Sequence, residues 1–343
     1  MIRFDQDYTR GAHELILKKL VDTNYEQTPG YGTDYHCANA SEYIRKACKH
    51  PDADIHFLVG GTQTNLTIIS SILRPHQAVI AAETGHIATS ETGAIEATGH
   101  KVLTIPTADG KITALQIKKL IEEHLRAPGR IHTPKPGMIF LAHSTETGGI
   151  YYKKELEEIK AVANEFDLPL FIDGARLGYA IAAKESDIDL ADLAEICDVF
   201  YIGGTKVGAL FGEAVVIMNE RLKPDFRYIM KQRGALLAKG RLLGLQFEAL
   251  FEDGLYLEIS RQAVSMAMRI KEALIKKGIQ LRYEAFTNQL FPVFSELEFK
   301  ILSEKYILAQ WSKENEHIVA RICTDWSTQE NHVEQFILDV ENL

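Results

Sequence analysis

The expected fold is decided by residues 199–218, VFYIGGTKVGALFGEAVVIM. The apolar run 199–202 predicts a buried strand, and a second apolar run, 214–218, predicts another. Lys206 stands between them among glycines, where the backbone is pinched and a ligand can come close. A lysine at such a place is either a surface residue that caps a strand or part of a binding site.

The same layout occurs one unit earlier, in LPLFIDGAR, residues 168–176. Its strand, 169–172, ends at Asp173, and ligands of open α/β sheets bind outside the carboxyl ends of the strands. Asp173 and Lys206 are therefore expected to face one crevice. An amine and a carboxylate there suit pyridoxal 5'-phosphate (PLP), because the lysine forms a Schiff base with its aldehyde and the carboxylate keeps its pyridine nitrogen protonated. Either residue alone is better explained structurally, as a strand cap or a turn aspartate; the pair favours the cofactor.

A phosphate site is predicted where Gly60-Gly61-Thr62 separates a strand, 55–59, from a helix, 63–73. Backbone N–H groups at a helix N-terminus bind anions, and the helix dipole adds to the attraction. The spacing matches neither the dinucleotide motif nor the nucleoside triphosphate loop. A single phosphate monoester fits better, although this motif alone is weak.

Composition excludes several classes of function. The chain has 343 residues, of which 46% are hydrophobic and 25% charged, as in ordinary globular proteins. Its net charge of -9 argues against a nucleic-acid partner. No leader-like segment and no apolar run of about 18 residues is present, so a cytoplasmic protein without a membrane partner is expected. The 4 cysteines are scattered and the 12 histidines lack ligand spacing, so no metal site is expected.

Strand and helix patterns alternate from residue 55 to 218, which predicts a mainly parallel α/β sheet with helices on both faces. After about residue 240 the pattern changes. We expect an N-terminal segment, 1–30, a large PLP-binding domain, 31–250, and a smaller C-terminal α+β domain, 251–343. A long helical stretch, 242–277, is interrupted near Asp253-Gly254, and Ser327 with Glu330 predicts a capping box at the last helix.

Four further residues are candidates for the site, each with a structural alternative. His86 follows a strand and could stack on a ring or carry protons, or be satisfied in its loop. Tyr31 lies in a glycine-rich loop and could line the site or anchor packing. Arg321 lies inside an apolar strand and needs a carboxylate, from the protein or from a substrate. His132 lies in an irregular surface segment, and its local sequence favours no catalytic role.

The sequence resembles the threonine aldolase branch of the PLP-dependent β-eliminating lyase family, which has fold type I. The resemblance covers nearly the whole chain. It rests most on the fairly specific runs FIDGARLGYA, 171–180, and GGTKVGALFGEAVV, 203–216, with weaker support from QTPGYGTD, 27–34, and GGTQTN, 60–65. The fold implied is a large domain with a mainly parallel sheet sandwiched by helices and a smaller C-terminal α+β domain.

The resemblance also implies roles for single residues. For the cofactor, it implies that Lys206 carries the Schiff base, that Asp173 pairs with the pyridinium, that Gly61 and Thr62 bind the phosphate, and that His86 stacks on the ring. Arg176 would contact the cofactor's phenolic oxygen or the substrate carboxylate, and Arg321 would bind the substrate carboxylate. His132 would be a second active-site histidine, and Tyr31 would lie near the site, from the partner subunit.

Three departures from the family pattern leave substrate preference more open than cofactor identity. Thr205 stands where the family more often has serine, but it keeps a hydroxyl. The basic residue for the phosphate is either Lys239 or Arg241. A substrate-contacting serine of many members is not clearly matched in residues 5–8.

The implied activity is cleavage of L-threonine, L-allo-threonine or a related β-hydroxy-α-amino acid to glycine and an aldehyde. The base for the β-hydroxyl is His86, His132 or a held water. Two alternatives stay open: β-elimination or transamination on the same lysine and aspartate, and a non-catalytic PLP-binding protein. Sites of this family form between subunits, which implies a homodimer or homotetramer.

Overall fold

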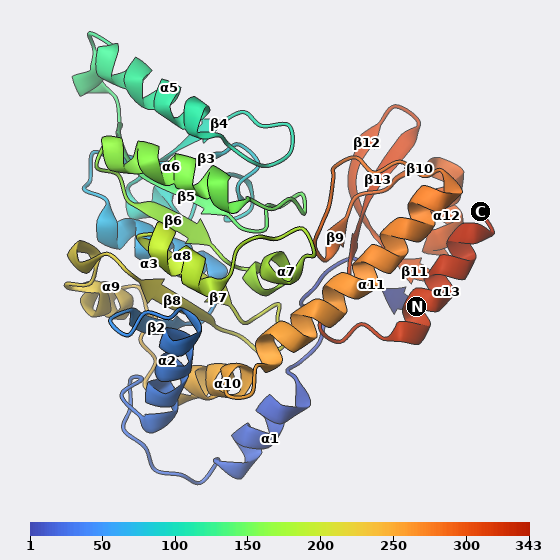
Figure 1. The fold of residues 1–343 in the computed structure, drawn as a ribbon, viewed down its shortest axis with the longest axis horizontal. Helices are drawn as coiled ribbons and strands as arrows, with labels where there is room; N and C mark the ends of the chain where they lie inside the picture. The colour runs from blue at the N-terminus through green and yellow to red at the C-terminus, as the bar shows by residue number, and fades with distance from the viewer.

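The computed structural model describes residues 1–343, which form a large layered lobe and a smaller lobe beside it (Figure 1). The large lobe is built on a 7-stranded sheet of order β2-β8-β7-β6-β5-β3-β4. Strand β8 pairs antiparallel with both of its neighbours, and the other pairs are parallel. The predicted mainly parallel sheet is confirmed. The strands are β2 (Asp54–Leu58), β3 (Gln77–Ala82), β4 (Lys101–Ile105), β5 (Lys135–Ala142), β6 (Leu170–Asp173), β7 (Val199–Gly203) and β8 (Glu213–Ile217).

Helices cover both faces of this sheet, so its central strands are buried on both sides. Every residue of β6, β7 and β8 is buried, which explains their continuous apolar runs. One face packs against α5 (Ala114–Arg126), α6 (Lys153–Glu165), α7 (Leu177–Ala182) and α8 (Leu190–Ile196). The other packs against α3 (Gly61–Ile72), α4 (His86–Thr89) and α9 (Phe226–Gln232). Helices α1 (Glu14–Asp22) and α2 (Tyr35–Ala47) pack against α10 (Arg241–Phe251).

Helix α11 (Leu255–Lys277) connects the two lobes (Figure 1). The predicted interruption before it is confirmed, because Gly254 adopts φ 76° between α10 and α11. Ala263 and Val264 belong to the core of the large lobe, whereas Met266 and Ala267 belong to that of the small lobe. The two hydrophobic cores therefore meet within α11. The domain boundaries expected at 30/31 and 250/251 stay a prediction.

The small lobe consists of an antiparallel sheet and two helices. Strands β10 (Val293–Ser295), β13 (His317–Cys323) and β12 (Ala309–Glu314) form the sheet, and β9 (Gln289–Leu290) also pairs with β13. Helices α12 (Glu296–Ser303) and α13 (Glu330–Glu341) complete the lobe. Strand β1 (Ile2–Arg3) pairs with β11 (Tyr306–Ile307), so the N-terminus packs on the small lobe and then crosses to the large one.

The capping box predicted at Ser327 and Glu330 is wrong, although the last helix is present. Gln329 is the N-cap of α13, and no side chain caps it. The Ser327 hydroxyl donates instead to Asp325 Oδ1 at 2.7 Å, because a tight turn competes for it.

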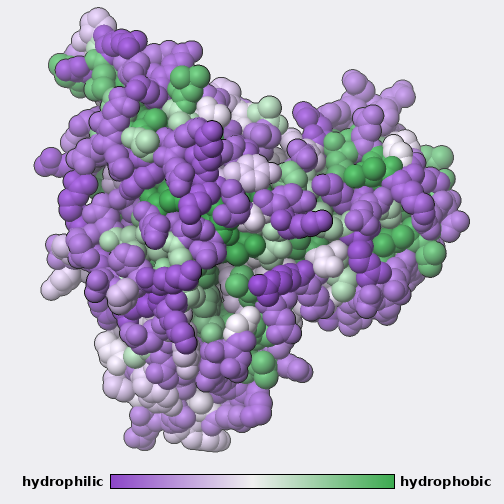
Figure 2. All heavy atoms as spheres, viewed as in Figure 1, coloured by the Kyte–Doolittle hydropathy of each residue, from purple (hydrophilic) through white to green (hydrophobic).

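Hydrophilic side chains cover most of the face shown in Figure 2, with small hydrophobic areas between them. None of the helices combines the length and the apolar composition that crossing a membrane requires.

Candidate active site

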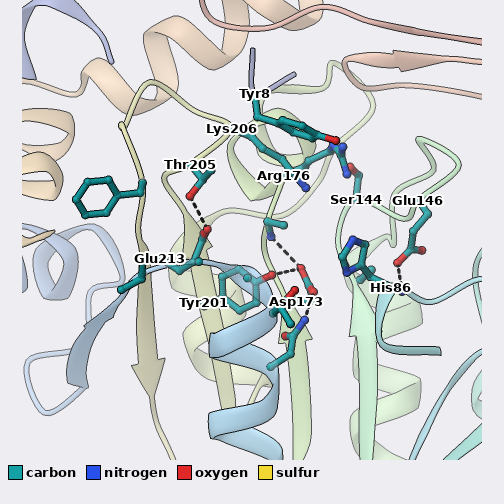
Figure 3. Close-up of a pocket in the computed structure, with 18 residues that line it drawn as sticks. Tyr8, His86, Ser144, Glu146, Asp173, Arg176, Tyr201, Thr205, Lys206 and Glu213 are labelled. Atoms are coloured by element: carbon teal, nitrogen blue, oxygen red, sulfur yellow. Dashed lines mark hydrogen bonds between the residues drawn. The ribbon is translucent and has the colours of Figure 1, made fainter. Parts of the chain in front are cut away.

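A cavity of about 320 Å³ opens at the carboxyl ends of the parallel strands (Figure 3). Asp173 ends β6, and Lys206 follows β7 by a short turn. Since β6 and β7 are parallel neighbours, their carboxyl ends meet at one edge of the sheet. Both side chains line the cavity, as the sequence predicts for a shared site.

The amine of Lys206 is held in a form suited to react with a carbonyl. Burial lowers its pKa, and the neighbouring charge of Arg176 lowers it further. Asp7, Asp173 and Glu213 attract the ammonium from a distance, but none of them forms a hydrogen bond with it. A lowered pKa leaves more of the amine neutral and therefore nucleophilic.

The turn that carries Lys206 is fixed by Thr205 and Glu213. The Thr205 hydroxyl donates to Glu213 Oε1 at 2.8 Å and accepts from the N–H of Gly212 at 3.0 Å. Burial raises the pKa of Glu213 to about 8. Thr205 thus acts through its hydroxyl, which is the feature that it shares with serine.

Asp173 is oriented by three donors. Tyr201 Oη and the N–H of Ala175 donate to Oδ1 at 2.5 and 3.0 Å, and Asn65 Nδ2 donates to Oδ2 at 3.0 Å. Two donors therefore occupy Oδ1, whereas Oδ2 keeps a lone pair for a ligand. This arrangement leaves Oδ2 as an acceptor for an N–H group of a ligand.

Gly60, Gly61 and Thr62 line another part of the cavity, at the N-terminus of α3. Gly60 is the N-cap and no side chain caps the helix, so the first N–H groups remain for a ligand. Together with the buried lysine and the aspartate, this end fits PLP: it supplies donors for a phosphate monoester without adding a second charge.

His86 is the first residue of α4 and also lines the cavity. Its backbone N–H donates to Glu146 Oε1 at 2.7 Å, and its ring Nδ1 lies 2.8 Å from Glu91 Oε1. Burial raises the pKa of Glu146 to about 7, and the charge of Asp173 adds to the effect. Glu146 thus holds the backbone of His86, and Glu91 holds its imidazole through Nδ1.

Arg176 is held by a bidentate ion pair with Asp7 from the N-terminal segment. Nε and Nη2 donate to Asp7 at 2.6 and 3.0 Å, and Asn288 Nδ2 donates to the same carboxylate at 2.9 Å. Burial alone would raise the pKa of Asp7, but the charges of Arg176 and Lys206 hold it at about 2. The remaining guanidinium nitrogen, Nη1, is free to bind an anionic or polar ligand group.

His132 does not line this cavity, and its role as a second active-site histidine stays a prediction. It lies in the exposed 3-10 helix Arg130–His132, before the amino end of β5. The cavity lies beyond the carboxyl end of that strand, where Ser144 and Glu146 line it. The 8 residues of β5 span about 25 Å, so the two places lie at opposite edges of the sheet.

Three other basic candidates and Tyr31 also lie outside the cavity lining. Arg321 donates from Nη2 to the backbone oxygen of Asp5 at 3.0 Å, and its buried Nε has no partner. Tyr31 is 45% exposed, and the ammonium of Lys231 lies 4.6 Å from its ring centroid. The side chain of Arg241 donates to Thr23, and Lys239 is exposed.

The structure adds lining or supporting residues that sequence reasoning missed: Asp7, Tyr8, Asn65, Glu91, Ser144, Glu146, Tyr201 and Glu213. Asp7 could have been found, because the arginine of DGAR needs a buried partner. Glu213 also carried a signal, since it is an acid that opens an apolar strand beside the lysine turn. The others required the three-dimensional arrangement.

Comparison with known proteins agrees with this geometry. The family model described as beta-eliminating lyase matches residues 7–335. A low specificity L-threonine aldolase of a Pseudomonas species is 32% identical over 346 residues, covering 98% of this chain and 96% of the relative. The counterpart from Pseudomonas aeruginosa is 32% identical over 298 residues, covering 86% and 84%.

Solved structures extend the comparison to the fold. The Leishmania major threonine aldolase superposes with a TM-score of 0.97 at 43% identity, covering 100% of this chain and 99% of that one. An aspartate aminotransferase of Thermus thermophilus, 14% identical with a TM-score of 0.73 and coverage of 100% and 91%, shares only the fold. The predicted fold type I is confirmed. The chain belongs to the beta-eliminating lyase family.

Proposed function

We propose that this protein cleaves L-threonine, L-allo-threonine or a related β-hydroxy-α-amino acid to glycine and an aldehyde, with PLP as cofactor. The observation that carries the proposal is the 43% identity over the full chain to the Leishmania major threonine aldolase. The cavity supports it, because the buried amine of Lys206 and the oriented carboxylate of Asp173 line the same space.

The residues that would hold PLP come from the carboxyl ends of four strands, β2, β3, β6 and β7. Lys206 would bind the aldehyde, Asp173 Oδ2 would accept from the pyridine nitrogen, and the N–H groups at Gly61 and Thr62 would bind the phosphate. His86 would lie against the ring. When bound, PLP supplies a sink for the electron pair that the broken Cα–Cβ bond leaves behind.

The remaining residues would orient the substrate and move its proton. Arg176 has one free guanidinium nitrogen for a carboxylate or for the phenolic oxygen of PLP, and Arg321 has an unpartnered Nε. A carboxylate held in one place fixes which bond at Cα stands perpendicular to the ring and therefore breaks. His86 or a water beside it would accept the β-hydroxyl proton.

A second candidate is β-elimination, which the family description favours. It would use the same lysine and aspartate, but its products are a keto acid and ammonia. The product therefore separates the two reactions. A non-catalytic PLP-binding protein would bind the cofactor and release neither set of products.

The test is an assay of the purified protein with PLP on L-threonine, L-allo-threonine and phenylserine, with the visible spectrum recorded alongside. We expect release of glycine and aldehyde in equal amounts. Lys206→Ala should abolish both this release and the visible band of the bound cofactor, while the control Lys154→Ala, on the exposed side of α6, should retain both. Keto acid and ammonia from the parent protein would establish elimination instead, and a variant at Lys206 with full activity would contradict its assignment.

The proposal includes a homodimer or homotetramer with the site at the subunit interface, in the cytoplasm. Tyr31 and either Lys239 or Arg241 would then serve the site of the neighbouring subunit. The four free cysteines, all buried, are compatible with a reducing compartment. Light scattering of the purified protein would give the assembly, and a monomer with full activity would contradict it.

A further inference from the structure

A buried row of hydrogen bonds runs behind the cavity from His86 to Tyr201. His86 Nδ1 lies 2.8 Å from Glu91 Oε1, and Asn65 Nδ2 donates to the same oxygen at 2.8 Å. The same amide nitrogen donates to Asp173 Oδ2 at 3.0 Å, and Tyr201 donates to Oδ1. The side chain of Glu91 is 0% exposed and does not line the cavity, so it can act on a ligand only through its two partners that do, His86 and Asn65.

The orientation of the Asn65 amide follows from its two neighbours. Glu91 and Asp173 both present carboxylate oxygens to it, and a carboxylate oxygen accepts hydrogen bonds. Only the NH₂ end of the amide has two hydrogens to give to two acceptors. A flipped amide would place its oxygen against both carboxylates and would leave both without this donor.

The hydrogen bonds of Glu91 also determine which ring nitrogen of His86 carries the hydrogen. Glu91 Oε1 already accepts from Asn65, and Oε2 is buried without any partner, so a proton placed on Oε2 would have no acceptor. Oε1 therefore accepts from His86 as well, and the donor is Nδ1–H. In a neutral imidazole this leaves the lone pair on Nε2, and Nε2 has no protein partner.

We propose that Glu91 is a positioning residue that fixes His86 as the Nδ1–H tautomer, so that Nε2 is the proton acceptor in the cavity, and that Asn65 joins this setting to Asp173. In the cleavage reaction, Nε2 takes the proton of the β-hydroxyl. The O–H pair becomes the second bond of the aldehyde C=O, and the Cα–Cβ pair stays with the glycine fragment. The proton on Nε2 then returns to that carbon, so no atom or electron is left over. The role of Nε2 in the cleavage reaction rests on the proposed function, whereas the assignment of the His86 tautomer does not.

The test compares Glu91→Leu, Glu91→Gln and the control Glu96→Gln, whose side chain is exposed five residues further on. Leucine removes the acceptor at similar volume. Glutamine keeps an oxygen that can accept from both Asn65 and Nδ1–H. The tautomer is measured by ¹⁵N NMR of histidine-labelled full-length protein, with and without PLP, and the His86 signal is assigned from its loss in His86→Gln. Thermal unfolding checks that each variant folds.

We expect the parent, Glu91→Gln and Glu96→Gln to show Nδ1–H at His86, and Glu91→Leu to populate Nε2–H. We further expect kcat for glycine release to fall about 10- to 100-fold in Glu91→Leu, with KM changed less than about threefold and Glu91→Gln close to the parent. An unchanged tautomer in folded Glu91→Leu, or an equal loss of kcat in Glu91→Gln, would overturn the proposal. If the parent itself releases no glycine, the proposed function fails, and the NMR comparison still decides the role of Glu91.

Discussion

At the scale of the residue, the pair of Asp7 and Arg176 shows how a buried charge is kept next to a reactive lysine. A lone arginine beside Lys206 would be costly in a buried site, and Asp7 supplies the compensating charge. The carboxylate also binds two of the guanidinium nitrogens, so it sets the direction of the third. A residue of the N-terminal segment thereby determines what the arginine of DGAR can bind.

Replacement of the Asp7 carboxylate should destabilise the folded protein. Asp7→Asn leaves Arg176 without a counter-charge, and we expect the free energy of unfolding at neutral pH to fall by about 2–4 kcal/mol. Because the folded pKa of Asp7 is about 2, below its ordinary 3.8, its contribution is present above pH 3.8 and is lost as the pH falls toward 2. Denaturant unfolding of parent and variant should therefore converge in acid. Asp22→Asn, at an exposed pair, is the control, and curves that stay equally separated at all pH values would contradict the assignment.

Glu146 gives folding stability a pH dependence opposite to that of Asp7. Its pKa of about 7 lies above the ordinary 4.5, because burial disfavours its charge. The folded state therefore holds a proton that the unfolded state has lost, and stability falls as the pH rises from 4.5 to about 7. Glu146→Gln removes this dependence and keeps an oxygen for the His86 N–H.

The measurement is the unfolding temperature of PLP-free protein at several pH values. We expect the gain in Glu146→Gln over the parent to be larger at about pH 8 than at about pH 5. Glu157→Gln, exposed on α6, should follow the parent throughout. A gain that is equal at both ends of the range would show that Glu146 does not titrate there.

At the scale of the element, the contact between β6 and β7 sets the distance between Asp173 and the turn of Lys206. Gly174 follows β6 and accepts at its carbonyl from the N–H of Gly203 at 2.9 Å. A Cβ at Gly174 would lie 1.8 Å from the carbonyl oxygen of Tyr201, which is backbone and cannot move away alone. The strands would have to separate.

Gly174→Ala should therefore lower the free energy of unfolding by about 3 kcal/mol or more, and the folded fraction should bind PLP more weakly. Chemical denaturation and a PLP titration would measure the two effects. Gly129→Ala is the matched control, because its Cβ would meet nothing nearer than 4.0 Å. A variant at Gly174 as stable as this control would mean that the two strands are not locked in this register.

Elements of this size were largely predictable from the sequence, for a physical reason. Buried strands show as continuous apolar runs, so the run 199–202 predicted β7, which spans Val199–Gly203, and the break at Gly254 follows from glycine's freedom at positive φ. Pairings between distant segments leave no such signal: β1 with β11 joins residues that are far apart in the chain. The site divides in the same way. Asp173 and Lys206 stand at strand ends and could be found, whereas Glu91 and Asn65 become partners only after folding.

At the scale of the whole molecule, the N-terminal segment connects the two lobes at the cavity. It leaves the small lobe after Phe4, whose N–H donates to Ile307 O at 3.0 Å, and it reaches the large lobe at Asp7. Asn288, from the small lobe, donates to Asp7 at 2.9 Å and to the backbone of Thr324 at 2.8 Å. The position of Arg176 thus depends on both lobes, and a movement of one lobe relative to the other would shift Arg176 in the cavity.

Loss of this link should loosen the segment without removing the ion pair. Asn288→Ala takes away two hydrogen bonds from buried groups, and we expect the free energy of unfolding to fall by about 1–3 kcal/mol. Amide hydrogen exchange should rise at Phe4 and Cys323, which are joined by a backbone hydrogen bond, while amides of β6 in the large lobe keep their protection. Because Arg176 would then be held less firmly, KM for the amino acid should rise more than kcat falls.

The control is Asn342→Ala, at the exposed end of α13, which should change neither the stability nor the exchange rates nor the kinetic constants. If exchange at Phe4 stayed at the parent's rate while KM rose, the effect would be local to the cavity and the two lobes would not be coupled through Asp7.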